Sequence, residues 1–150
     1  MYFMTGSESC IFCINNEKIG TAGVSPDRIL DSYDYWWLIL QPEAKREKTK
    51  LAAGMLIAKR HIEIVSHITS EEAAEVMHII KPAAQSLCEA VGSTYTDQET
   101  VGFNQGSEAG QTVKHAHVHV LPVSIEDPVE LKVRGGIGGA FEALRESRLQ

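Results

Sequence analysis

The sequence is poor in cysteine and proline and has no long hydrophobic run. Three of its 150 residues are cysteine and five are proline. The first residues, Met1–Glu8, have neither the basic start nor the apolar core of a signal peptide. A disulfide framework is therefore not expected, and the cytoplasm is the expected location. No apolar stretch reaches the ~20 residues that a membrane-spanning helix needs, so we expect no membrane partner.

An excess of positive charge is also lacking. Fourteen Lys and Arg face twenty Asp and Glu, which leaves a net charge of −6. This balance argues against nucleic acid as the main partner, but local polar groups can still bind a small phosphorylated ligand. With 43% hydrophobic and 23% charged residues, the composition is that of a soluble globular protein. The length predicts one domain over residues 1–150, with enough core to fold alone.

The pattern of elements predicts an α+β fold with a mostly antiparallel sheet. The expected strands are Asp27–Asp31, Asp34–Leu40 (after a turn at Ser32-Tyr33), Met55–Ala58, Val101–Asn104 and Lys114–Val120. The polar stretch Gln41–Lys50 is expected to be a solvated loop, because its charges are mixed. Strands precede and follow one long helix, which is typical of the α+β class.

The long helix is predicted over Ser70–Val91. Thr69 and Glu72 match a capping box, Pro82 is expected to kink the helix, and Gly92 fits a left-handed stop. The apolar stripe expected to face the sheet is Ala73, Val76, Met77, Ile80, Ala84, Leu87, Cys88 and Val91. Outside this stripe we expect His67 and His78 at the surface, a hinge at Gly135–Gly139, and a short C-terminal helix around Phe141–Arg145.

Three histidines alternate with small apolar residues near the end of the chain. His115, His117 and His119 are separated by Ala116 and Val118, and Val120 follows. A period of two is typical of a strand, with the Ala and Val side chains on the buried face and the imidazoles on the other. Side chains two apart on a strand lie roughly 6.5–7 Å apart, so the three rings can line one ligand.

Such a row serves either of two chemistries. Imidazoles two apart can bind zinc, as in some hydrolases. Alternatively, one imidazole is a nucleophile and its neighbours neutralise a phosphate. The residues upstream favour the second: Asn104, Gln111 and Thr112 offer neutral donors, and the glycines of the Gly106–Gly110 turn let backbone N–H groups approach an anion.

The segment Asn104–Pro122 resembles the signature of the histidine triad (HIT) nucleotide hydrolases and transferases. Looser matches are Cys10–Cys13 and Ile57–His61, so the resemblance covers about residues 10–122 and leaves 123–150 as a C-terminal tail. It implies a HIT-like fold, a homodimer with two sites, and attack on the α-phosphate of a small nucleotide. Dinucleoside polyphosphates and nucleoside phosphoramidates are the substrates it implies.

The resemblance also implies roles for individual residues. His117 resembles the nucleophile that forms a nucleotidyl-histidine, with the carbonyl of His115 accepting from its ring, and His119 resembles the histidine that contacts phosphate. The remaining site residues are Asn104, Gly110, Gln111 and Thr112 near the phosphates and Gln41 near the ribose. Histidine at position 119, where the transferase branch often has glutamine, favours hydrolysis. Many members have a histidine and a proline where this chain has Ala53 and Ala58.

Two alternatives to a hydrolase remain open at this level. One is a nucleotidyl transferase or phosphorylase of the same family. The other is a nucleotide-binding adaptor or sensor with incidental turnover, which would use the same residues.

A metal site is the second prediction. The Cys10-x-x-Cys13 spacing is a weak signal alone, but with His61 and His115 it makes a set of two thiols and two imidazoles, which suits a closed tetrahedral zinc site. Zinc-bearing members of the HIT family use comparable positions. The alternative is that both cysteines are small buried hydrophobic residues.

Overall fold

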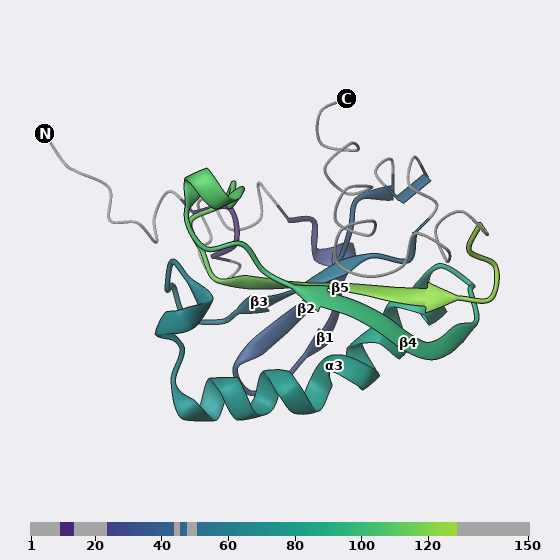
Figure 1. The fold of residues 1–150 in the computed structure, drawn as a ribbon, viewed down its shortest axis with the longest axis horizontal. Helices are drawn as coiled ribbons and strands as arrows, with labels where there is room; N and C mark the ends of the chain where they lie inside the picture. Colours follow the sequence, from purple (N-terminus) through teal and green to yellow (C-terminus); the bar gives the residue numbers. More distant parts are fainter. Residues whose placement is uncertain (1–9, 14–23, 44–45, 48–50, 129–150) are drawn as a thin grey trace, which may run out of the picture.

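A single antiparallel sheet with one long helix on one face forms the body of the molecule (Figure 1). The computed structural model describes residues 10–13, 24–43, 46–47 and 51–128. The predicted α+β arrangement is confirmed. The Gly135–Gly139 hinge and the short C-terminal helix fall outside the described residues. Within these residues, no helix is long and apolar enough to cross a membrane.

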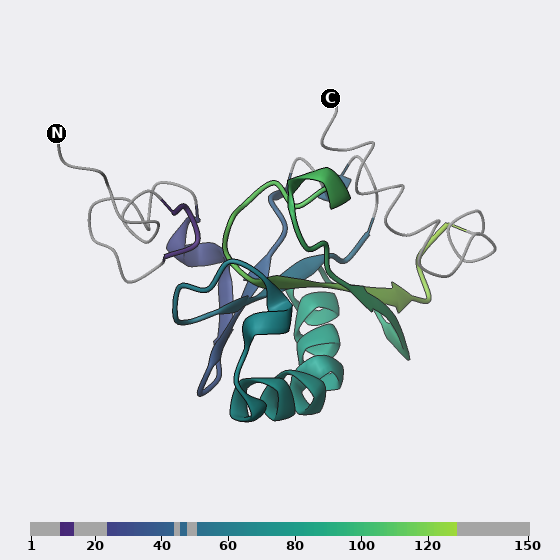
Figure 2. The ribbon, with the colours of Figure 1, turned by 60° about the vertical axis from the view of Figure 1, so that its left-hand side comes forward.

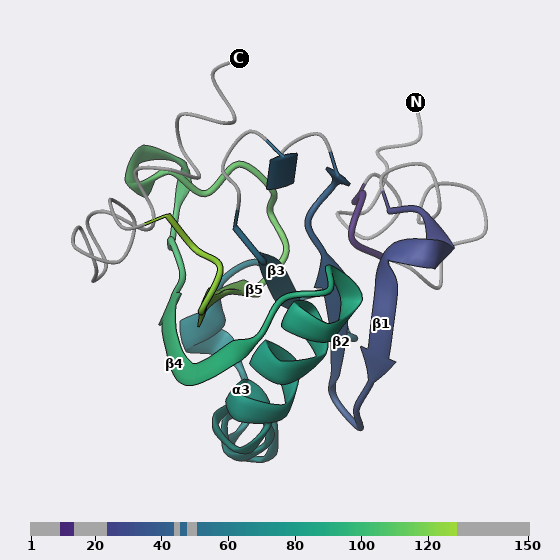
Figure 3. The ribbon, with the colours of Figure 1, turned by 90° about the vertical axis from the view of Figure 1, so that its right-hand side faces the viewer.

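The sheet has five strands in the order β1-β2-β3-β5-β4, which Figure 3 shows side by side. Their bounds are β1 Ile29–Ser32, β2 Trp36–Leu40, β3 Gly54–Ala58, β4 Tyr95–Gly102 and β5 His117–Ser124. The strand expected from Asp27 begins only at Ile29. Asp27 and Arg28 belong to a 3-10 turn that the N–H of Arg28 closes by donating to the carbonyl of Ser25 at 2.9 Å.

The turn between β1 and β2 comes later than expected. Ser32 is still paired with Trp37 in the ladder. The carboxylate of Glu75, on the long helix, accepts the backbone N–H groups of Asp34 at 3.1 Å and Tyr35 at 2.7 Å. A side chain 40 and 41 positions away thus satisfies these two N–H groups of the turn, which no local pattern reveals.

The strand expected at Val101–Asn104 is in fact the last part of a longer strand, β4. This strand lies at the edge of the sheet and carries Asp97, Gln98 and Glu99 in its middle. Asp97 has a left-handed φ of 67°, and the pairing register shifts between Tyr95 and Gln98. Edge strands tolerate charges and bulges, so hydrophobic alternation did not reveal its first half.

β5 begins and ends later than the expected Lys114–Val120. The N–H of Ala116 donates to Ile62 in a loop, at 2.6 Å, before regular pairing starts. At the other end, Pro122 lies inside the strand, beyond Val120, the last residue paired with β3. The carbonyl of Ala116 accepts from the N–H of Ala58 on β3. Because the backbone groups of every second residue point to the same side of a strand, the nitrogen of Pro122 also faces the β3 side. Pairing with β3 has already ended there, so the missing N–H of proline costs no hydrogen bond of the sheet.

The long helix α3 spans Ser70–Ala90, one residue less than expected. The capping box is present: Thr69 accepts from the N–H of Glu72 at 3.1 Å, and Glu72 accepts from the N–H of Thr69 at 2.8 Å. Gly92 follows with a left-handed φ of 70°, as expected.

The buried face of α3 differs slightly from the predicted stripe. Its buried apolar residues are Val76, Ile79, Ala83, Ala84, Leu87 and Cys88. Met77, which was expected to be buried, is 70% exposed, whereas Ile79 is buried. The face of the helix that packs on the sheet is therefore rotated from the predicted stripe toward Ile79. His67 and His78 are exposed, as expected. Leu87 packs on Gly54 of β3, where a Cβ would lie 2.4 Å from it, so the helix approaches the sheet closely at this glycine.

The sheet is buried on both faces. One core lies between α3 and the sheet and includes Val118 and Val120 of β5. A second, smaller core lies on the opposite face, where Cys10 and Phe12 pack against Met55 and Ile57 of β3. Figure 2 shows the Cys10–Cys13 segment and the Ser107–Ala109 turn on the side of the sheet away from α3.

Candidate active site and metal centre

The three histidines lie on the face of the sheet opposite α3. The predicted alternation is confirmed, since Ala116, Val118 and Val120 belong to the core under the helix. The expectation that only this apolar face is buried is wrong: His115, His117 and His119 are 0%, 5% and 2% exposed. The Cys10–Cys13 segment, distant in sequence, packs against His115 and His117. His115 also precedes the first residue of β5.

The ring of His117 is held by a hydrogen bond and by the packing of two neighbouring rings. Its Nδ1 lies 2.6 Å from the carbonyl oxygen of His115, the acceptor expected from the sequence. Because a carbonyl only accepts, Nδ1 carries the proton and Nε2 the unshared electron pair. The rings of His119 and Phe12 pack against His117 at centroid distances of 5.3 and 5.2 Å, both nearly perpendicular to it.

The two ring nitrogens of His115 have the opposite roles to those of His117. Its Nε2 lies 2.6 Å from the carbonyl oxygen of Ala58, so Nε2–H donates to the main chain and Nδ1 is turned toward the cysteines. Burial lowers the pKa of His115 to about 4. The hydrogen bond to the Ala58 carbonyl acts in the opposite direction and raises this pKa, while the nearby His61 and His117 lower it further. The ring is therefore neutral near pH 7, as a metal ligand must be.

The four predicted metal ligands come together. Single donor atoms of Cys10, Cys13, His61 and His115 all lie within 4.8 Å of one another. Nδ1 of His115 is 3.3 Å from Sγ of Cys10, 3.7 Å from Sγ of Cys13 and 3.2 Å from Nδ1 of His61. The Cys13 and His61 donor atoms are 3.3 Å apart.

These separations suit one tetrahedral ion. With bond lengths of about 2.0–2.3 Å, the ligand atoms of a tetrahedral zinc site lie ~3.3–3.8 Å apart. Burial, and then the neighbouring Cys10, raise the pKa of Cys13 to about 12. A cation must therefore displace the thiol proton as it binds, which makes its affinity rise with pH. The cluster could bind a metal ion.

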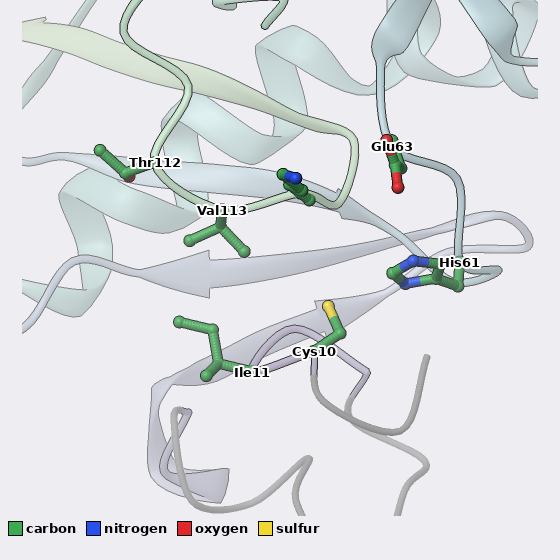
Figure 4. Close-up of a pocket in the computed structure, with 7 residues that line it drawn as sticks. Cys10, Ile11, His61, Glu63, Thr112 and Val113 are labelled. Atoms are coloured by element: carbon green, nitrogen blue, oxygen red, sulfur yellow. The ribbon is translucent and has the colours of Figure 1, made fainter. Parts of the chain in front are cut away.

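A cavity of about 310 Å³ opens beside these four candidate metal ligands. Figure 4 shows its walls: Cys10, Ile11 and His61 on the metal side, and Thr112 and Val113 on the loop side; Glu63 and Lys114 complete the lining. Thr112, a predicted substrate contact, is exposed here. A ligand in this space would reach the loop that precedes the histidine row.

Asn104 and Gly110 lie against each other, as a shared phosphate site requires. A Cβ on Gly110 would lie 3.6 Å from Nδ2 of Asn104, and Gly110 has a left-handed φ of 99°. A glycine is favoured at this position because other residues rarely adopt that backbone conformation.

The side-chain amide of Gln111 makes hydrogen bonds to main-chain groups of the protein. Its side-chain nitrogen donates to the carbonyl oxygens of Glu63 at 2.6 Å and Val113 at 2.9 Å, and its oxygen accepts the N–H of Gly106 at 2.8 Å. The sequence predicted a donor to phosphate at this position. In this structure the amide braces the loop instead.

Gln41 lies farther from the histidines. It follows β2, which is separated from β5 by β3, and its N–H donates to the carbonyl of Ala53 at 2.9 Å. By alternation with Ile39, its side chain is on the histidine face of the sheet. Ala53, where the family resemblance implies a histidine in many members, is 1% exposed.

Phe12 was not identified from the sequence. It is 6% exposed and contacts both His117 and His115. Its position between two predicted ligands, Cys10 and Cys13, was the one available signal, because a metal site near His115 brings the whole turn to the histidine row.

Comparisons with known proteins agree with this geometry. Residues 49–124 match the HIT domain family, so the chain belongs to that family. Protein hit of Bacillus subtilis is 26% identical over 120 residues, which are 77% of this chain and 72% of that protein. The structure of a HIT family hydrolase from Clostridium thermocellum is 28% identical, with a TM-score of 0.53, over 81% of this chain and 96% of that one.

A third solved structure shares the fold. It is a Zn-bound histidine triad family protein from Mycobacterium smegmatis, 22% identical, with a TM-score of 0.59 over 95% of this chain and 93% of that chain.

Proposed function

We propose that this protein is a nucleotide hydrolase in which His117 attacks the α-phosphate of a small nucleotide. The observation that carries the proposal is the hydrogen bond from Nδ1 of His117 to the carbonyl of His115. It selects the tautomer in which Nε2 is the nucleophile and turns the ring to one orientation. The 28% identical Clostridium protein bears the name of a hydrolase, which supports the same class.

The reaction has two steps at phosphorus. Nε2 of His117 forms a bond to the α-phosphorus, and the leaving group departs with the electron pair of its own bond. An amine leaving group takes up a proton from solvent as it departs. Water then attacks the same phosphorus, gives a proton to solvent, and returns the electron pair to Nε2. The products are a nucleoside monophosphate and the leaving group, which is a nucleotide in a dinucleoside polyphosphate or an amine in a phosphoramidate.

The neighbours of His117 stabilise the charge that develops on the phosphate. We assign this role to His119, whose ring packs on that of His117, and to the donors Asn104 and Thr112. Gly110 lies against Asn104, and its N–H would reach phosphate by giving up its bond to the carbonyl of Ser107, which is 3.1 Å long. Gln111 braces the loop, and it would reach phosphate by exchanging one carbonyl acceptor for a phosphate oxygen. Gln41 would contact the ribose. Loss of one such donor commonly lowers the rate by about a hundredfold.

We further propose that the metal is zinc and that its role is structural. Two thiolates and two neutral imidazoles are typical ligands of closed zinc sites, and zinc would supply a fixed tetrahedral crosslink between the N-terminal segment and the sheet. The candidate ligand cluster in the described part of the chain includes His115 but neither His117 nor His119. This grouping favours a nucleophilic over a metal-bound role for His117.

Covalent labelling of the protein tests the function. Mixing the purified protein with a dinucleoside polyphosphate or a nucleoside phosphoramidate should give a nucleotidyl adduct that mass spectrometry places on His117. His117→Asn should abolish both labelling and turnover while leaving nucleotide binding largely intact. His67→Asn and His78→Asn, at exposed positions, serve as controls. A His117→Asn protein with a tenth of the wild-type turnover would disprove the covalent route, and binding without turnover in the wild type would favour a sensor.

A further inference from the structure

One short turn, Cys10–Cys13, carries both candidate thiol ligands of the metal and also Phe12, the aromatic residue that packs on His117. The N–H of Cys13 donates to the carbonyl of Cys10 at 3.2 Å and closes the turn. Phe12, between them, meets the ring of His117 at 5.2 Å with an interplanar angle of 80°, and the ring of His115 at 6.1 Å and 83°. Such edge-to-face contacts are favourable and directional. Atoms that bind metal and atoms that hold His117 are thus one residue apart.

A second connection runs through His115. Its Nδ1 faces the sulfur of Cys10 at 3.3 Å, while its carbonyl oxygen accepts from Nδ1 of His117. A metal ion bound to Nδ1 of His115 would therefore fix the position of His115, and the main-chain carbonyl of His115 in turn orients the ring of His117. The two connections reach the ring from different sides, one through a packed side chain and one through a hydrogen bond.

The orientation of this ring matters for attack on phosphorus. Nε2 must lie in line with the departing group, and a misplacement of about 1 Å can lower a rate by about a hundredfold. The hydrogen bond to His115 restrains Nδ1 of the ring, and Phe12 and His119 pack against the ring at interplanar angles of 80° and 79°. A smaller side chain at position 12 removes one of these restraints without touching a metal ligand.

We infer that Phe12 positions His117, and that metal binding by the Cys10–Cys13 turn keeps Phe12 in place. The reaction that this arrangement serves is the proposed one, but the state of the His117 ring can be measured without any substrate. Phe12 acts through His117 and is not itself a catalytic residue.

The first experiment compares variants of the metal-loaded protein. Phe12→Leu and Phe12→Met remove the ring, and Met keeps most of its volume. Ile125→Leu, at a 61% exposed position in the turn after β5, is the control. The readouts are metal content, the nitrogen-15 NMR signals of the His117 imidazole, and the single-turnover rate of nucleotidyl-His117 formation.

We expect one Nδ1–H signal set for His117 in the wild type and in Ile125→Leu. Both Phe12 variants should keep the metal, show exchange between ring states, and form the adduct roughly tenfold to a hundredfold more slowly, with little change in nucleotide affinity. A wild-type His117 spectrum in both Phe12 variants overturns the inference. So does a loss of nucleotide affinity with an unchanged spectrum, because Phe12 would then be a ligand contact.

The second experiment removes the metal from the wild type with a chelator. The His117 signals should change toward those of Phe12→Leu and return when zinc is added, and chelation should change Phe12→Leu much less. A folded, metal-free protein with unchanged His117 signals overturns the role of the metal; if that protein unfolds, the comparison of metal-loaded variants decides. If the wild type forms no adduct, the proposed function fails, and the spectra still decide the inference.

Discussion

The side-chain amide of Gln111 donates to the carbonyl oxygen of Glu63 at 2.6 Å. This bond joins the loop before the histidine row to the segment that follows β3 and carries His61. Since the same amide also engages Val113 and Gly106, its polar atoms have partners on both sides of the loop. Gln111 therefore braces the loop that carries the proposed phosphate contacts.

Gln111→Leu keeps the volume of this side chain and removes all of these bonds. Buried polar groups left unsatisfied cost ~1–3 kcal/mol each, so we expect the free energy of unfolding to fall by at least that amount in chemical denaturation. Gln105→Ala removes a single exposed bond, to the N–H of Ser66, and should have a small effect. Equal stability of Gln111→Leu and the wild type would show that the amide does not brace the loop.

Zinc content is checked most directly by elemental analysis. The wild type, purified without chelator, should contain about one zinc ion per chain, and Cys13→Ser should lose most of it. The melting temperature of the wild type should fall when a chelator removes the ion, because a ligand that binds only the folded state stabilises it. Cys88→Ser is the matched control, since Cys88 is buried in the core under α3 and should not affect metal content. A zinc content near zero in the wild type contradicts the proposal.

Glu72 makes stability depend on pH. Its carboxylate accepts from Nε and Nη2 of Arg60 at 3.0 and 2.9 Å and from the N–H of Thr69. Burial alone would raise the pKa of Glu72, but the donors from Arg60 and Thr69 lower it below its usual value. Because the folded pKa lies below the unfolded one, the stabilisation is fully present above about pH 4.3 and is lost as pH falls through the folded pKa.

Glu72→Gln should therefore be less stable than the wild type at pH 7, by about 1–3 kcal/mol, and this difference should shrink as the pH falls below about 4. Unfolding by denaturant at a series of pH values measures it. Glu71→Gln, one residue earlier and exposed, should change stability by less than ~0.5 kcal/mol. A difference for Glu72→Gln that does not vary with pH would show that its charge is not involved.

A homodimer remains a prediction from the family resemblance. In the sequence, the apolar cluster Tyr35-Trp36-Trp37 would support a dimer if it were exposed, but it is largely core: Trp36 is 0% exposed and Trp37 packs against the second core. Light scattering at micromolar concentration should give twice the chain mass of 16.5 kDa. If α3 lies in the interface, Met77→Lys at its 70% exposed position should weaken the dimer, and Ile125→Lys, in a turn and 61% exposed, should not. A monomer mass for the wild type would disprove the dimer.

Local patterns in the sequence were sufficient for much of this protein. The capping box of Thr69 and Glu72, the stop at Gly92 and the two faces of the His115–Val120 segment follow from rules that act within a few residues. The candidate ligand set of Cys10, Cys13, His61 and His115 was also recognisable, because thiols and imidazoles are the ligands that zinc prefers.

The tertiary structure decided what covers these elements. Only packing shows that Phe12 lies on His117, that Gln111 turns its amide to Glu63, and that Glu75 holds the turn after β1. It also decided which side of α3 is buried, leaving Met77 outside, and how far the charged edge strand β4 extends. Each of these depends on contacts between segments far apart in the chain, whose energy is set by where the whole fold places them, so no window of sequence contains it.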